Sequence, residues 1–208
     1  MIKLAHFTET NQATLVQFMQ NNAFAIVTAM GHPYPVATHI PLEVIQQADG
    51  SILLTGHIMR KTDHHRAFEN NPHVLVIFNG PHTYISSSWY NNLVTASTWN
   101  YMTVHARGII HFLDEAATLE AVKSITEKYE GHHNKASFQH IPQQDVQAML
   151  KGIVAFEIKV EALSNVFKLS QNRDEPSQLK IIEALNKRGD ENSRLIATEM
   201  SNRLNKTS

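Results

Sequence analysis

The stretch GPHTYISSSWYNNLVTASTWNYMTVHARGII, residues 80–110, is the most informative part of this chain of 208 residues. It combines two tryptophans and three tyrosines with a dense set of hydroxyl and amide side chains. Such a mixture does not suit a core, because every buried O–H and N–H group must find a hydrogen-bond partner. It does suit a surface that binds a flat ligand with polar edges. We therefore expect the functional site in this stretch.

The regions on either side of this stretch alternate short strands with helices. Residues 154–160 alternate apolar and polar side chains, which predicts a half-buried strand. Six or more short strands with few long helices between them favour an antiparallel barrel over a doubly wound parallel sheet. The predicted fold class is mainly β with peripheral helices (α+β). Further strands are predicted at 24–30, 36–40, 52–56, 74–79 and 99–112, and helices at 12–22, 61–70, 114–129 and around 146–150, the last closed by Gly152.

The last forty or so residues differ from the rest of the chain. After KLSQNR (Lys168–Arg173) the pattern becomes helical, with Gly189 between two helices. We predict one barrel domain over residues 1–165. Residues 166–208 form a C-terminal segment, in which a motif loop is followed by helices.

Several functional classes are excluded by composition. The chain has no cysteine, so it has no disulfide, thiolate metal site or cysteine nucleophile. No apolar run approaches the roughly 18 residues of a membrane helix, and we expect no secretory signal in MIKLAHFTET. The histidine pairs at 64–65 and 132–133 lack a third ligand at helical spacing, so no metal site is assigned. We expect a cytoplasmic protein without a membrane partner.

DNA binding is not evident from the sequence. The formal net charge of −1 gives no general attraction to phosphates, and no helix-turn-helix is apparent. Neither GxxxxGK[ST] nor GxGxxG occurs, so the glycine-rich phosphate loops are absent too. A phosphate group would have to be bound by arginine, lysine and hydroxyl groups.

The segment GHIMRKT (56–62) is the best candidate for such a phosphate site. Here a strand ends in the adjacent basic residues Arg60 and Lys61 at the start of a helix, where free N–H groups and the helix dipole add to their charge. The same spacing also fits a basic pair on an exposed turn. The residues alone leave both interpretations open.

The aromatic cluster likewise has more than one interpretation: core, ligand platform or dimer interface. Trp89 and Tyr90 follow three serines, and Trp99 follows two more hydroxyl residues. These neighbours favour a platform, since a heterocycle with several edge acceptors needs donors of that kind. A flavin ring fits, but composition does not choose it over a nucleotide base.

Four motifs carry a resemblance to a known family. These are GHIMRKTDHHRAFENNP (56–72), GPHTYISSSWY (80–90), STWNYMTVHARG (97–108) and KLSQNR (168–173). Together they resemble the PaiB family of FMN-binding negative transcriptional regulators, in order and over essentially the whole chain. That family is similar to the pyridoxamine-phosphate-oxidase-like flavoproteins. The resemblance implies an FMN-binding split β-barrel of antiparallel Greek-key type with a helical C-terminal extension, and a homodimer with FMN in the groove between subunits.

The resemblance also implies which residues bind the cofactor. Arg60 and Lys61 match the basic pair that contacts the FMN phosphate, and His57 adds a donor. A late motif closes the site from the partner chain with Gln171, Asn172 and Arg173. No catalytic residue is assigned. The ribityl chain and ring are expected along Ser86, Ser87, Ser88, Trp89, Tyr90, Thr98, Trp99 and Asn100.

Three functions remain open at this point. The first is a flavin-binding regulatory protein in which FMN acts as ligand or redox sensor. The second is an FMN-dependent oxidoreductase for a small-molecule substrate, with Tyr101, His105 and Arg107 as candidates for positioning that substrate. The third is a dimeric scaffold that has lost FMN, which the presence of the basic pair and the motifs disfavours. The sequence leans against an enzyme without deciding the question.

Overall fold

Seven strands form one antiparallel sheet in the computed structural model, which describes residues 1–2, 4–91 and 96–207. Their order is β2-β1-β5-β6-β7-β4-β3. The strands are β1 (Phe24–Ala29), β2 (Val36–Pro41), β3 (Glu43–Gln46), β4 (Ile52–Met59), β5 (His73–Ile85), β6 (Thr98–Phe112) and β7 (Ile153–Lys168). The α-helices are α1 (Gln12–Asn21), α2 (Asp63–Asn70), α3 (Glu115–Glu130), α4 (Gln143–Gly152), α5 (Glu175–Arg188) and α6 (Glu191–Thr207), and the 3₁₀ turns are η1 (Ala5–Phe7), η2 (Ser87–Trp89) and η3 (Phe138–His140). The predicted antiparallel β fold with peripheral helices is confirmed.

The chain divides into two compact units. The first consists of residues 1–18, 79–104 and 164–208, and the second of residues 19–78 and 105–163. Strands β5, β6 and β7 therefore contribute residues to both units. The predicted domain boundary at residue 165 stays a prediction.

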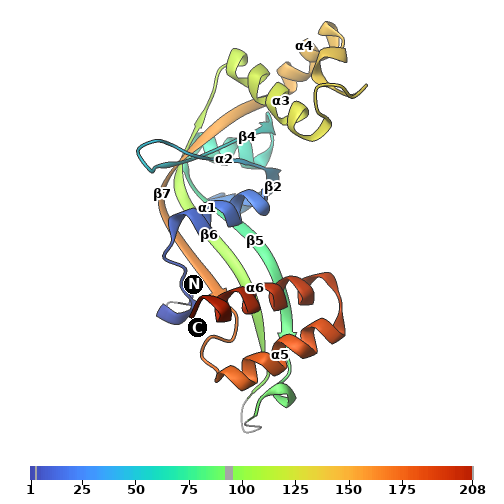
Figure 1. Ribbon diagram of the computed structural model, residues 1–208. Helices are drawn as coiled ribbons and strands as arrows, with labels where there is room; N and C mark the ends of the chain where they lie inside the picture. The colour runs from blue at the N-terminus through green and yellow to red at the C-terminus, as the bar shows by residue number, and fades with distance from the viewer. Residues whose placement is uncertain (3, 92–95, 208) are drawn as a thin grey trace. The chain divides into compact units, whose positions relative to one another are not determined.

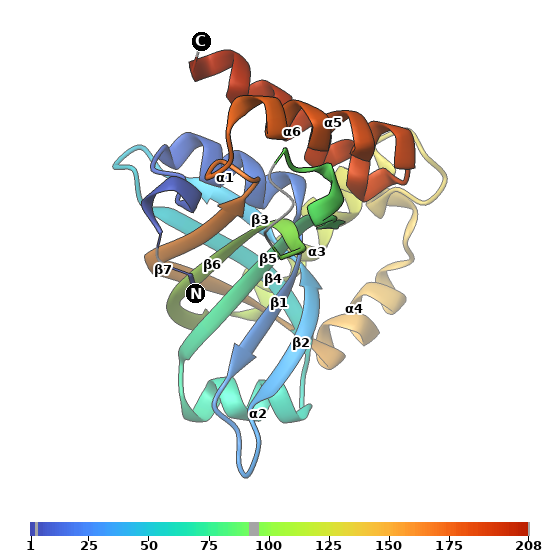
Figure 2. The ribbon, with the colours of Figure 1, turned by 90° about the horizontal axis from the view of Figure 1, so that it is seen from below.

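The core of the second unit is formed by alternate residues of its strands. β1 and β2 form an antiparallel hairpin (Figure 2), and β4 pairs antiparallel with β7. Val27, Leu54 and Phe156 are fully buried on these strands. Gly108 on β6 is required by a close backbone approach, since a Cβ there would lie 2.2 Å from the carbonyl oxygen of Lys159.

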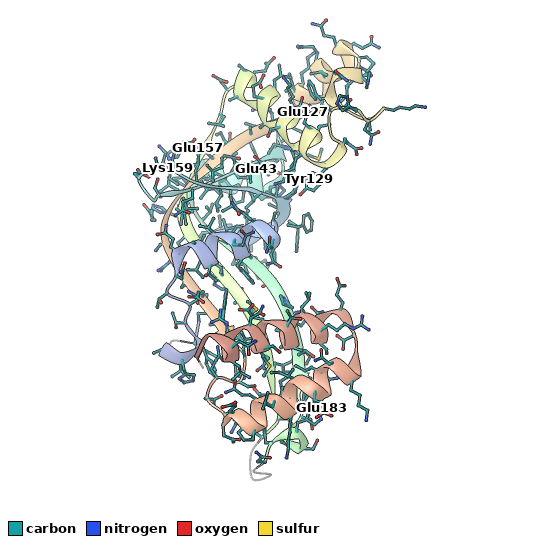
Figure 3. All side chains as sticks on the ribbon, in the orientation of Figure 1. Glu43, Glu127, Tyr129, Glu157, Lys159 and Glu183 are labelled. Atoms are coloured by element: carbon teal, nitrogen blue, oxygen red, sulfur yellow. The ribbon has the colours of Figure 1, made fainter. Side chains whose placement is uncertain are left out.

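Helix α3 packs on the same unit. The buried hydroxyl of Thr118 accepts a hydrogen bond from the N–H of Ala155 on β7, at 3.0 Å. At the other end of α3, the ammonium of Lys128 lies 3.1 Å from the carboxylate of Glu43 on β3. Figure 3 shows Glu43 beside Tyr129, the next residue of this helix. These contacts hold α3 against β3 and β7.

Helices α5 and α6 of the first unit lie side by side (Figures 1 and 2). Gly189 separates them, as predicted from the sequence, and adopts the left-handed conformation at φ 77°. The carboxylate of Asp174 caps α5 by accepting from the N–H of Ser177 at 2.9 Å. Leu185 and Ile196 bury the facing sides of the pair.

Some elements differ from their predicted bounds. β5 continues to Ile85 although Gly80 and a proline follow the predicted end, because the glycine lets the strand pass a ring: a Cβ at Gly80 would lie 2.6 Å from Phe18. β7 likewise continues to Lys168. The short strand β3 was not predicted. The helix α4 ends at Gly152, as predicted, although this glycine is its last residue and Ile153 is the C-cap.

Two features are absent from the described ranges of the chain. None of the helices found there has the length and apolar character needed to cross a bilayer. Within the same ranges, no group of three or more His, Cys, Asp or Glu residues is placed to hold a metal ion.

Candidate functional site

The predicted phosphate site lies in the second unit, between β4 and α2. Arg60 and Lys61 follow directly on the end of β4, and α2 begins two residues later, as the sequence predicts. The Nε of Arg60 donates to the carbonyl of Ile153 at 2.8 Å, and its backbone N–H donates to the carbonyl of Gly152 at 2.8 Å. A guanidinium has five N–H donors. Fixing it through Nε leaves the two terminal nitrogens to form a fork for an oxyanion.

Lys61 and the first turn of α2 complete this loop. Lys61 is exposed and adopts φ 64°, in the left-handed region. The hydroxyl of Thr62 accepts from the N–H of His65 at 3.2 Å, and the carboxylate of Asp63 accepts from the N–H of His64 at 2.8 Å. These two helix N–H groups are therefore already taken. The basic side chains, rather than the helix N-terminus, supply the attraction for an anion.

His57 lies on β4 and is half-buried. Burial lowers the pKa of its imidazole below the ordinary 6.5, because the charged form loses solvation. The ring is therefore neutral near pH 7. It offers one N–H donor and adds little positive charge to the Arg60–Lys61 pair.

The predicted ring-binding residues lie in the first unit, where the serines form a hydroxyl cluster around η2. The hydroxyls of Ser86 and Ser88 are 2.8 Å apart. The N–H of Ser87 donates to the hydroxyl of Ser97 at 3.0 Å, and the two hydroxyls are 3.3 Å apart. A hydroxyl both donates and accepts, so these groups keep capacity for a ligand.

Two arginines cover the aromatic residues that follow the serines. The guanidinium of Arg188 lies over the ring of Trp89, 4.8 Å from its centroid, and that of Arg173 lies 4.4 Å from the centroid of Tyr90. Tyr90 is buried, with 4% of its surface exposed. Its hydroxyl is the only buried side-chain polar atom without a hydrogen-bond partner in the described part of the chain. Such an atom needs a ligand or water to satisfy it.

The motif KLSQNR folds against the start of β6. Asn100 is fully buried; its Nδ2 donates to the hydroxyl of Ser170 at 3.0 Å, and that hydroxyl donates back to Oδ1 at 3.2 Å. Gln171 is bound within its own loop: its Oε1 accepts from the N–H of Leu169 at 2.7 Å, and its Nε2 donates to the carbonyl of Phe167 at 2.5 Å. Asn100 and Gln171 therefore shape this loop.

Two of the remaining predicted residues, Thr98 and Trp99, contact Lys168. Its ammonium donates to the hydroxyl of Thr98 and, at 2.9 Å, to the carbonyl of Trp99. The ring of Trp99 is half exposed and makes an edge contact with Tyr84, with centroids 6.0 Å apart. Asn172 is exposed on the loop.

The structure thus gathers the predicted residues into two groups. His57, Arg60 and Lys61 belong to the second unit, and the other predicted residues belong to the first. Sequence reasoning missed Lys168 and Ser170, although both stand in the KLSQNR motif, and it missed Ser97. The only signal for these residues in the sequence was their membership in the motifs KLSQNR and STWNYMTVHARG. The hydrogen bond between Asn100 and Ser170 joins residues 70 positions apart and has no local signature.

A comparison with protein families settles the identity of the fold. Residues 1–162 match the model of the family described as "Putative FMN-binding domain". The chain belongs to this family. It is also 37% identical, over 202 residues, to "Protease synthase and sporulation protein PAI 2" of Bacillus subtilis, a match that covers 97% of each chain. The resemblance to the PaiB family is confirmed.

Solved structures agree on the fold. The FAD and heme binding protein from Mycobacterium smegmatis matches with a TM-score of 0.60 at 15% identity, covering 83% of this chain and 78% of that one. The flavocytochrome Anf3 from Azotobacter vinelandii matches with a TM-score of 0.58 at 15% identity, covering 80% and 72%. The FMN-binding split barrel predicted from the sequence is confirmed.

The residues present fit FMN, the cofactor of this family. Arg60 and Lys61 form a cationic pair suited to a phosphate monoester. The serine hydroxyls supply polar groups for a sugar-alcohol chain and a ring edge. The assignment of individual residues to parts of the cofactor stays a prediction.

Proposed function

We propose that this chain is a homodimeric flavin-binding regulatory protein, in which Arg60 and Lys61 hold the FMN phosphate. The aromatic and hydroxyl residues of the first unit then line the flavin. The observation that carries the proposal is the guanidinium fork of Arg60, fixed through Nε with its terminal nitrogens left for an oxyanion. A regulatory role is supported by the name of the Bacillus subtilis relative, which refers to protease synthesis and sporulation.

The contribution of the basic pair is testable by cofactor retention. The protein is mixed with FMN, excess flavin is removed by gel filtration, and the visible absorbance of the protein fraction is recorded. We expect Arg60→Ala with Lys61→Ala to weaken FMN binding at least about 100-fold, because each charged hydrogen bond contributes about 1.5–3 kcal/mol. The matched control is Arg66→Ala, an exposed arginine on α2. Equal affinity in the double variant and the control would place the phosphate elsewhere.

The dimer is tested separately. The oligomeric state is measured by light scattering across a dilution series while bound flavin is followed in the same fractions. If the site needs both subunits, FMN is released as the dimer dissociates. Tight FMN binding to a monomer would refute the proposed assembly.

A second candidate function is an FMN-dependent oxidoreductase. A groove of about 530 Å³ in the second unit favours it. Apolar residues such as Val74, Leu75 and Met30 line it, together with Arg107, His73 and Glu161. Arg107 is one of the three residues that the sequence offers for positioning a substrate, whereas Tyr101 and His105 do not line the groove. Reduction of the bound flavin by NADH or NADPH, followed by reoxidation with a small-molecule acceptor, would favour this function over a purely regulatory one.

A further inference from the structure

We propose that Lys168, Arg173 and Tyr90 form a second anion site, in the first unit, that binds the carboxylate or phosphate group of a small molecule other than FMN. This inference rests on the proposed assignment of the FMN phosphate to Arg60 and Lys61. It adds a binding residue, Lys168, that neither the motif assignment nor the family comparison supplies.

The charge of Lys168 is the first observation. Its ammonium donates to two neutral oxygens, those of the Thr98 hydroxyl and the Trp99 carbonyl. An ammonium has three N–H donors, so one remains for a ligand. Burial, and then the nearby charge of Arg173, lower the pKa of Lys168. Both residues are half-buried in one short loop, and two cations in such a setting favour the binding of an anion.

The position of Arg173 is the second observation. Its N–H donates to the carbonyl of Ser170 at 3.0 Å, and its own carbonyl accepts from the Nε2 of Gln178 at 2.8 Å. The guanidinium rests on the ring of Tyr90. The backbone and the ring thus fix the arginine before a ligand arrives, which lowers the entropy cost of binding.

The hydroxyl of Tyr90 is the third observation, and it is independent of the two charges. It is buried and has no partner in the described part of the chain, and it belongs to the ring that the guanidinium of Arg173 covers. A phenol donates a hydrogen bond to an oxyanion. Asp174 is the acidic residue nearest to Arg173 in the sequence. Its carboxylate accepts hydrogen bonds from Ser177 and from the Nδ2 of Asn91. The site therefore offers three kinds of donor: ammonium, guanidinium and phenol.

Inorganic phosphate is the probe for the test, measured by calorimetric titration at low ionic strength. In the Arg60→Ala, Lys61→Ala background we expect one phosphate site to remain, and Lys168→Met in that background to weaken it at least tenfold. Lys168→Arg should retain binding. Tyr90→Phe should weaken phosphate binding several-fold while leaving stability unchanged or higher, since the hydroxyl it removes has no partner.

Saturating the wild-type protein with FMN distinguishes a site for a second ligand from a site for the phosphate of FMN itself. Retained phosphate binding that is sensitive to Lys168→Met supports a second ligand. Loss of phosphate binding on FMN saturation overturns the proposal, because the cofactor phosphate would then occupy this site. Unchanged binding in both Lys168→Met and Tyr90→Phe overturns it as well. Failure of the proposed function has a different signature: FMN affinity that survives the Arg60→Ala, Lys61→Ala change.

Discussion

The hydrogen-bonded pair of Asn100 and Ser170 is predicted to hold the KLSQNR loop in the shape that presents Lys168 and Arg173. Replacing Asn100 with alanine removes two reciprocal hydrogen bonds, of 3.0 and 3.2 Å. Ser170 is only 3% exposed, and the substitution leaves its hydroxyl without this partner. Because an unsatisfied buried group adds to the loss of the bonds themselves, we expect the free energy of unfolding to fall by about 2–4 kcal/mol.

A matched pair of substitutions at Ser170 separates the hydrogen bonds from the backbone. Ser170 adopts φ 64°, in the left-handed region. Alanine and glycine both remove its hydroxyl, but only glycine adopts that conformation without a steric penalty. We therefore expect Ser170→Gly to be more stable than Ser170→Ala by about 1 kcal/mol.

Urea unfolding followed by tryptophan fluorescence is the assay. Both tryptophans of the chain, Trp89 and Trp99, belong to the first unit, so the signal reports on the unit that contains this loop. Asn172→Ala, at an exposed neighbouring position, is the control and should change stability by less than about 0.5 kcal/mol. A loss in Asn100→Ala no larger than the control's, or equal stability of the two Ser170 variants, would refute this account of the loop.

Three further predictions concern the scaffold and its pH dependence. Gly108→Ala should unfold the protein or lower its stability by several kcal/mol, because the new Cβ would lie 2.2 Å from the Lys159 carbonyl oxygen. Gly152→Ala is the control and should be tolerated, because the space around that residue is open. Thermal melts compare the two variants. Since the folded-state pKa of His57 lies below 6.5, its contribution to stability is present above that value and lost as pH falls through the folded-state pKa. Urea midpoints by circular dichroism should therefore drop more for wild type than for His57→Gln between about pH 7.5 and 5.5. Arg188→Ala removes hydrogen bonds of 2.9 and 2.8 Å and a contact over a tryptophan ring, so it should lower stability by about 1–3 kcal/mol and shift the fluorescence maximum.

Most of the fold could be predicted from the sequence, because apolar periodicity is local. The helix α1 begins and ends within one residue of its predicted bounds, and β6 does the same. The prediction failed where tertiary packing decides. Gly80 and Pro81 predict the end of a strand after residue 79. In the structure the strand continues, and the missing side chain of Gly80 leaves room for the ring of Phe18. β3 is only four residues long, too short for a clear alternation of apolar and polar side chains.

The candidate site shows the same division. Motif identity located the loops that follow β4 and β7, since these motifs are contiguous in the chain. It could not separate side chains that face a ligand from those that build the loop. Asn100 and Gln171 stand in the motifs, but their polar groups bind the protein itself. Lys168 opens the KLSQNR motif, and only the folded chain shows that its ammonium binds the Thr98 hydroxyl and the Trp99 carbonyl, 70 and 69 residues away in the sequence.

The two cationic loops share one backbone conformation. Among the described residues, Lys61 and Ser170 are the non-glycine positions with positive φ, both at 64°. Each lies in a loop that leads from a strand through basic residues into a helix capped by a side chain, Thr62 for α2 and Asp174 for α5. A left-handed conformation costs a non-glycine residue about 1–2 kcal/mol, so it persists only where the surroundings impose it. At Ser170 the reciprocal hydrogen bonds with Asn100 offset this cost, and at Lys61 the left-handed residue is the exposed lysine of the predicted phosphate site.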